Sequence, residues 1–222
     1  DIHEYFPEID SSLAIIQAQV SGEICLMGHS TGGLITALYA SEHQDSKAFS
    51  SLILNSPFFD MNLDAFSENI LVPIGEFNGS FFPDMELKGE LPVFYNYSIH
   101  KDYYGEWDYK FEYKPLTAPP VTLGWIRAIR QAQKTIQNGI KITQPVLVLH
   151  SDKTIYDKKW SAVFFTGDAV LDVEDIKTYS KSISGQVVMK EIPNALHDVI
   201  LSKSPVRDVA FAAMKAFMET DN

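Results

Sequence analysis

The sequence predicts an α/β fold built on a mostly parallel sheet flanked by helices. Two observations support this prediction. Continuous apolar strands alternate with helical patterns along the chain, and a G-x-S-x-G motif stands between one strand and the helix that follows it. The 222 residues, 45% of them apolar, are enough for one large domain with a substantial core.

Each element follows from a local pattern. Apolar residues at helical spacing predict a first helix over residues 8–20. After the motif, the same spacing predicts a helix to about residue 42, another beginning near residue 172 and a last one over 205–219. Short apolar runs predict four buried strands, over residues 24–27, 51–55, 145–150 and 186–192.

A long stretch of different composition separates the second strand from the third. Residues 58–142 hold sixteen of the 27 aromatic residues, and a structureless loop of that length is improbable in a compact domain. We expect an inserted cap that ends in a helix over 123–137 and covers an apolar substrate pocket. The expected organisation is a core of residues 1–57, a cap of 58–142 and a second core segment of 143–222.

The motif places a serine where it can act as a nucleophile. Residues 28–33 read Gly-His-Ser-Thr-Gly-Gly, directly after the apolar run 24–27. A sharp turn between a strand and a helix forces the serine into a strained backbone conformation and lifts its hydroxyl clear of the sheet. We expect Ser30 to be a nucleophile rather than part of a glycine-rich loop without chemistry.

A serine hydroxyl needs a neighbouring imidazole to take its proton. Two histidines lie downstream of the motif on plausible loops. His150 ends the third strand, and His197 lies in a short loop between the fourth strand and the last helix. From that loop His197 can reach back over the strand ends, so we expect it to be the general base. His29 is expected to support the turn, because adjacent side chains at a tight turn diverge.

A carboxylate must orient the imidazole, and two aspartates compete for this role. In chains with a strand–turn–helix nucleophile, the order is serine, acid, histidine. Between Asp168 and His197 the sequence predicts one helix and one strand. If Asp152 were the acid, residues 156–165 would form an additional segment between the acid and that helix. We expect Asp168 to be the acid and keep Asp152 as the alternative. Asp172 has the pattern of a helix cap.

Four stretches of the chain carry a family resemblance: residues 28–33, 145–151, 167–171 and 194–198. Together they resemble the α/β-hydrolase superfamily, in particular its branch of serine aminopeptidases and monoacylglycerol lipases. The resemblance covers nearly the whole chain outside the cap. In that family an Asp-x-Val stretch after the strand carries the acid, and Asp168 lies in such a stretch. The family usually places its acid soon after the strand, which keeps Asp152 as an alternative.

The resemblance implies a serine hydrolase that cleaves esters with an apolar moiety through an acyl-enzyme. Ser30, His197 and Asp168 would form the triad, and the Thr31 amide would stabilise the oxyanion. No metal and no organic cofactor is expected, and the expected partner is a small ester or lipid-like molecule. An aminopeptidase- or amidase-like hydrolase is the alternative within the enzyme class, although the aromatic-rich cap favours esters. A non-catalytic ligand-binding relative is the alternative outside it.

The resemblance also implies parts that this sequence lacks. Such hydrolases carry several strands before the nucleophile strand, and a loop that supplies the second oxyanion N–H. Only about seven residues precede the first predicted helix, so we expect a piece of a longer protein that lacks the N-terminal part of the sheet. The strand 24–27 would then have an unpaired edge, through which the chain self-associates or binds the missing part. Activity would be reduced accordingly.

Charge and composition argue against some partners. A net charge of −11 disfavours nucleic acids and anionic membrane surfaces, which need a basic patch. No apolar run reaches the ~18 residues of a membrane-spanning helix. Cys25 is the single cysteine, so it cannot form an intramolecular disulfide. The first residues carry no signal-peptide pattern, and we expect a cytoplasmic protein.

Overall fold

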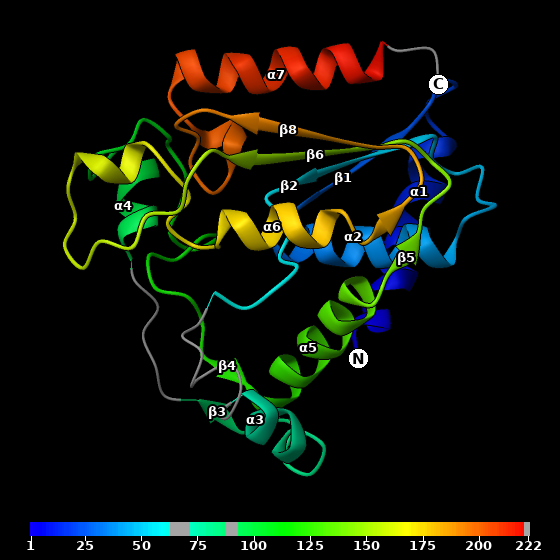
Figure 1. Cartoon of the computed structure of the whole chain (residues 1–222), viewed down its shortest axis with the longest axis horizontal. Coiled ribbons are helices and arrows are strands. Elements are labelled where there is room, and N and C mark those ends of the chain that lie inside the picture. The colour runs from blue at the N-terminus through cyan, green and yellow to red at the C-terminus, as the bar shows by residue number, and fades with distance from the viewer. Residues whose placement is uncertain (63–71, 88–92, 220–222) are drawn as a thin grey trace.

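The structure is a computed structural model that describes residues 1–62, 72–87 and 93–219. Its centre is a four-stranded sheet with the order β1-β2-β6-β8 (Figure 1). Each neighbouring pair of strands is parallel, which confirms the predicted mostly parallel sheet. The strands are β1 (Cys25–His29), β2 (Ser51–Asn55), β6 (Val146–Ser151) and β8 (Val187–Ile192).

Helices cover both faces of this sheet. Helix α7 (Ser204–Met218) lies on one face, and α2 (Thr31–Glu42) and α6 (Val173–Ser180) lie on the other (Figure 1). On the side of α2, the short 3-10 helix η1 (Ile2–Tyr5), α1 (Phe6–Gln17) and α5 (Leu123–Gln137) complete a continuous apolar core. The first helix begins earlier than its apolar spacing predicts, because Pro7 can occupy its first turn.

The side chains of β2 divide between the two faces as the pleat requires. Leu52 and Leu54 belong to the core shared with α2, whereas Ile53 packs with Leu147 and with Phe217 of α7. All five residues of β2 are buried. This is why the strand reads in the sequence as a continuous apolar run rather than an alternating one.

Among its described residues, the segment between β2 and β6 contributes helices, a small antiparallel pair of strands and the two-residue strand β5 (Ile140–Lys141). Figure 1 shows α4 (Phe94–Ile99) near the carboxyl ends of the sheet strands, whereas α3 (Val72–Asn78) lies beyond α5, away from the sheet. The pair consists of β3 (Glu86–Leu87) and β4 (Val121–Thr122). Residues 63–71 and 88–92 of the predicted cap lie outside the described residues, and the predicted cap boundaries stay a prediction.

Several short elements have no counterpart in the sequence patterns, because two to four residues carry no periodicity. Strand β5 pairs in parallel with β7 (Ile183–Ser184). The other short elements are the 3-10 helices η3 (Ala162–Phe165) and η4 (Val199–Leu201). Within the described residues β1 pairs with β2 alone, so its other edge has no strand beside it. No helix in the described part of the chain is long and apolar enough to cross a membrane.

Candidate active site

The nucleophile turn joins β1 to α2 at Ser30. Its φ of 54° and ψ of −119° lie in a region that residues with a side chain rarely adopt. The Ser30 N–H donates to the carbonyl oxygen of Asn55 at 3.0 Å, which ties the turn to the end of β2. A Cβ at Gly28 would overlap the carbonyl oxygen of Gly32. Glycine at position 28 therefore lets β1 and α2 approach closely enough to hold the serine in this turn.

His197 lies opposite the serine, on the loop that leads from β8 to η4. Its Nε2 is 3.0 Å from Ser30 Oγ, and its Nδ1 is 2.9 Å from Asp168 Oδ2. The histidine is 3% exposed and the aspartate fully buried. The structure thus brings the three residues expected from the sequence into one chain of hydrogen bonds. In this arrangement Nε2 is free to accept the serine proton while a carboxylate holds Nδ1–H.

Asp168 reaches the histidine because the loop before it is closed at its base. The Asp168 N–H donates to the carbonyl oxygen of Lys153 at 2.9 Å, and the Ile155 N–H donates to that of Asp168 at 2.7 Å. These bonds place residue 168 beside the chain that leaves β6, and residues 156–167 loop out between them. The acid therefore lies close to the end of β6 in space although it lies 17 residues beyond it in sequence (168 − 151).

The backbone fixes the orientation of the Asp168 carboxylate. Its Oδ1 accepts the N–H groups of Val170 and Leu171 at 2.8 and 2.9 Å. Its Oδ2 is then left to face Nδ1 of His197. Two backbone N–H groups and the imidazole of His197 thus hold this buried carboxylate in one orientation.

Asp152, the alternative acid, lies in a different environment. Its Oδ1 accepts the Asn194 N–H at 2.6 Å, and its Oδ2 is 3.9 Å from the Lys153 ammonium. These contacts hold the loop that carries His197 without touching the imidazole itself. Of the two aspartates weighed from the sequence, Asp168 is the one hydrogen-bonded to the histidine.

Thr31 is the first residue of α2, directly after the serine. The first N–H groups of a helix have no acceptor within it, and they lie at the positive end of the helix dipole. Ser30 occupies the N-cap position, yet its side chain makes no capping hydrogen bond. Its hydroxyl is bonded to His197 instead.

A second polar network lies next to the first, and no sequence pattern predicted it. The Asn55 side chain donates to Asp198 Oδ1 at 2.7 Å and accepts the Val199 N–H at 3.2 Å. The hydroxyl of Tyr95, on α4, accepts the Asp198 N–H at 3.3 Å. The Tyr95 ring also stands edge-on to the His197 ring, with 5.6 Å between their centroids. The available signals were a polar residue ending an apolar strand and an acid directly after the histidine.

The two rings that contact His197, those of His29 and Tyr95, are neutral at neutral pH. Burial and then the charge of His197 lower the pKa of His29 from 6.5 to about 4. His29 Nδ1 lies 3.0 Å from the Asn55 carbonyl oxygen, so the neutral ring supports the turn as expected. Burial, and to a smaller extent the charge of Asp198, raise the pKa of Tyr95 well above its usual value.

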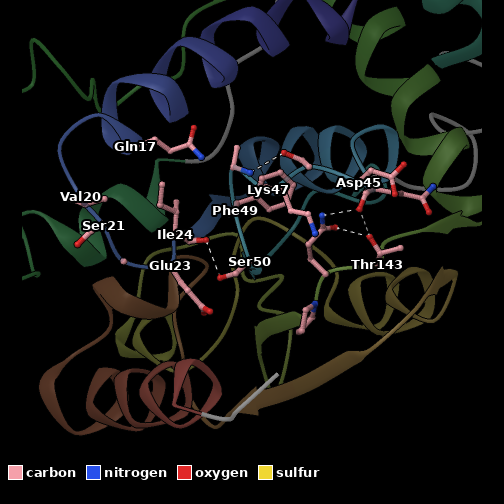
Figure 2. Close-up of a pocket in the computed structure, with 16 residues that line it drawn as sticks. Gln17, Val20, Ser21, Glu23, Ile24, Asp45, Lys47, Phe49, Ser50 and Thr143 are labelled. Atoms are coloured by element: carbon pink, nitrogen blue, oxygen red, sulfur yellow. Dashed lines mark hydrogen bonds between the residues drawn. The ribbon is translucent and has the colours of Figure 1, made fainter.

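A hollow of about 850 Å³ lies elsewhere, at the amino ends of the strands (Figure 2). Its lining includes Glu23, Lys47, Ser50 and Thr143, which come from the loops before β1, β2 and β6. Ser30 follows the carboxyl end of β1, so the hollow and the serine lie at opposite ends of the same sheet. Across the described residues, no three His, Cys, Asp or Glu side chains gather where they could hold a metal ion.

Comparisons with known proteins agree with the α/β fold described above. The family model described as "Serine aminopeptidase, S33" matches residues 1–203 of the 222. No curated protein matches the chain. The structural matches below are all under 20% identical, so they bear on the fold alone.

Three of these solved structures have lipolytic descriptions. The monoacylglycerol lipase of Paleococcus ferrophilus has a TM-score of 0.65 at 14% identity, over 97% of this chain and 74% of that one. A soluble variant of the Saccharomyces cerevisiae monoglyceride lipase gives 0.63 at 14%, over 96% and 69%. A metagenome-derived lipolytic enzyme gives 0.61 at 15%, over 98% and 73%.

Proposed function

The chain belongs to the serine aminopeptidase S33 family of α/β-hydrolases and has the fold of the monoacylglycerol lipases. We propose that it is a serine hydrolase that cleaves carboxylic esters with an apolar acyl or alcohol part. One observation carries this proposal: a nearly buried His197 lies within hydrogen-bond distance of both Ser30 Oγ and the Asp168 carboxylate. Nucleophilic acyl transfer requires this order of groups.

In the proposed reaction Ser30 Oγ attacks the ester carbonyl while His197 Nε2 takes its proton. Asp168 keeps Nδ1–H in place and stabilises the imidazolium, and the Thr31 amide donates to the oxyanion. His197 then protonates the leaving alcohol, which departs and leaves an acyl group on Ser30. A water molecule, activated by the same imidazole, releases the acid and restores the serine. No cofactor is needed for these steps.

Aromatic side chains beside the serine support an apolar substrate. Phe58 follows the end of β2, donates its N–H to the Ser30 carbonyl oxygen at 3.0 Å and stacks with Trp125 of α5. Tyr95 of α4 contacts the His197 ring from the other part of the same inserted segment. We therefore propose that residues 58–142 act as a cap that supplies apolar contacts to the substrate.

Amide cleavage is the second candidate, because the family description names an aminopeptidase. An aminopeptidase needs an anionic group that binds the substrate amine. Asp198 lies near the site, but its carboxylate accepts from Asn55 and from the Ile200 N–H, and it is 14% exposed. Both bonds are made by Oδ1, and the low exposure of the carboxylate favours the ester proposal over the amine-binding one.

The test is a matched panel of chromogenic substrates. Acyl 4-nitrophenyl esters are compared with anilides of the same acyl chain and with amino-acid 4-nitroanilides, using the wild type and Ser30→Ala. We expect ester turnover that rises with acyl length and falls at least ~10³-fold in Ser30→Ala. Faster cleavage of the amino-acid anilides would replace the ester proposal by the aminopeptidase one. Substrate binding without turnover would instead indicate the non-catalytic ligand-binding relative.

We also propose self-association through β1, whose outer edge has no strand partner among the described residues. Unpaired N–H and C=O groups on such an edge pair readily with a second strand. Met27 lies on this strand and is 37% exposed, so Met27→Lys should weaken the contact. Light scattering should give a dimer mass for the wild type and a smaller one for the variant, whereas a monomeric wild type contradicts this proposal. The cytoplasmic location stays a prediction.

A further inference from the structure

Asn55 is the last residue of β2 and lies between the two loops that carry Ser30 and His197. In the sheet register it stands beside His29, the residue before the nucleophile. Its carbonyl oxygen accepts the Ser30 N–H at 3.0 Å and lies 3.0 Å from His29 Nδ1. The main chain of Asn55 is therefore bonded to the nucleophile turn.

The side chain of the same residue is bonded to the histidine loop. Asn55 Nδ2 donates to Asp198 Oδ1 at 2.7 Å, and Asn55 Oδ1 accepts the Val199 N–H at 3.2 Å. Asp198 and Val199 are the two residues directly after His197. Asn55 is fully buried, so water does not compete for these bonds.

We propose that Asn55 is a positioning residue that sets the distance between Ser30 Oγ and His197 Nε2 by tying both loops to one point of the sheet. The inference rests on the proposed hydrolase function and names a residue through which that site is held. Proton transfer depends steeply on such distances, and a misplacement of ~1 Å can cost ~10²-fold in rate. Groups fixed by rigid elements keep the required geometry better than groups on free loops.

The two bonds require both a donor and an acceptor on one short side chain. An aspartate at position 55 would still accept the Val199 N–H, but it would place a second carboxylate against Asp198. Oδ1 of Asp198 already accepts the Ile200 N–H at 3.2 Å, and Oδ2 of Asp198 lies 3.9 Å from His29 Nε2. A like charge at this distance would push the two loops apart.

The neighbouring residue, Ser56, provides a matched control. It is also fully buried at the end of β2, but its hydroxyl has no hydrogen-bond partner among the described residues. Ser56→Ala removes a polar group from the same place without touching the histidine loop. A general effect of substitutions at the end of β2 would therefore appear in both variants.

The experiment compares Asn55→Asp, Asp198→Asn, the exchange variant Asn55→Asp/Asp198→Asn and Ser56→Ala with the wild type. The exchange variant reverses donor and acceptor in the bond between positions 55 and 198 and keeps an acceptor for the Val199 N–H, while the Ile200 N–H loses its acceptor at position 198. We expect Asn55→Asp to lower kcat on an ester ~10²-fold with KM within about twofold. The exchange variant and Asp198→Asn should stay within about fivefold of the wild type. The defect of Asn55→Asp should shrink as the pH falls, because a proton shared by the two carboxyl groups restores the bond.

Two results would overturn the inference. One is an Asn55→Asp variant no slower than Ser56→Ala, and the other is an exchange variant that stays slow or does not fold. Melting temperatures separate slow from unfolded variants, and the exchange variant decides the question if Asn55→Asp does not fold. A wild type without turnover would refute the proposed function instead. The positioning role is then tested by NMR. The ¹⁵N chemical shifts of the His197 ring should differ from the wild type in Asn55→Asp and match the wild type in the exchange variant.

Discussion

The two ends of the central sheet hold their polar groups in different ways. At the carboxyl ends of the strands, Asn55, Asp168 and His197 are buried and joined by hydrogen bonds to neighbours of opposite character. At the amino ends, a hollow of about 850 Å³ is lined by exposed side chains such as Lys47 (Figure 2). In this chain the convergence of buried, bonded groups marks the candidate site, and the size of a hollow does not.

The largest effect is expected when a single carboxylate is neutralised at the carboxyl ends of the sheet strands. Asp168→Asn keeps the shape of the acid but cannot stabilise the imidazolium, and its amide favours the wrong tautomer of His197. We expect kcat on an ester to fall ~10³–10⁴-fold. Asp152→Asn, in the adjacent loop, should change kcat by no more than about threefold. A larger loss in Asp152→Asn than in Asp168→Asn would reverse the assignment of the acid.

A smaller effect is expected from the neutral histidine beside the serine. The pKa of His29 is 6.5 when exposed and about 4 in the fold, so the unfolded chain binds more protons between these values. The contribution of the neutral His29 to the free energy of unfolding is present above about pH 6.5 and is lost as the pH falls toward 4. With the side chain 32% exposed, we expect a loss of roughly 1–2 kcal/mol.

Urea unfolding at pH 7, 5.5 and 4 measures this loss, with His29→Asn as the control. Asparagine can keep the bond to the Asn55 carbonyl oxygen without titrating. The decline in unfolding free energy between pH 6.5 and 4 should be shallower in the variant than in the wild type. Parallel curves for the two proteins would show that His29 does not titrate as the structure implies.

The smallest effect is expected at the amino end of the sheet. Lys47 lines the hollow there and lies far from the hydrogen-bonded groups around Ser30. Lys47→Ala should leave both kcat and KM of an ester within about twofold of the wild type, as surface substitutions usually do. A tenfold change in either constant would contradict the division between the two ends.

Local patterns predicted the positions of the regular elements well, because these depend on neighbouring residues, but the predicted burial of the last strand was wrong: four of the six residues of β8 are exposed. The strand Ser51–Asn55 and the helix Leu123–Gln137 have the ranges that their apolar patterns predicted. The choice between two aspartates was harder, because it depends on the backbone bonds that close the loop before Asp168. The hydrogen bond between Asn55 and Asp198 joins residues 143 positions apart, and a local sequence pattern cannot predict a contact over that separation.

The central claim is that Ser30 is an activated nucleophile, and intact mass spectrometry tests it most directly. The wild type and Ser30→Ala are incubated with a fluorophosphonate, which forms a covalent adduct with an activated serine. The account predicts one adduct on the wild type and none on Ser30→Ala. A folded wild type without an adduct, or an equal adduct on Ser30→Ala, would contradict it.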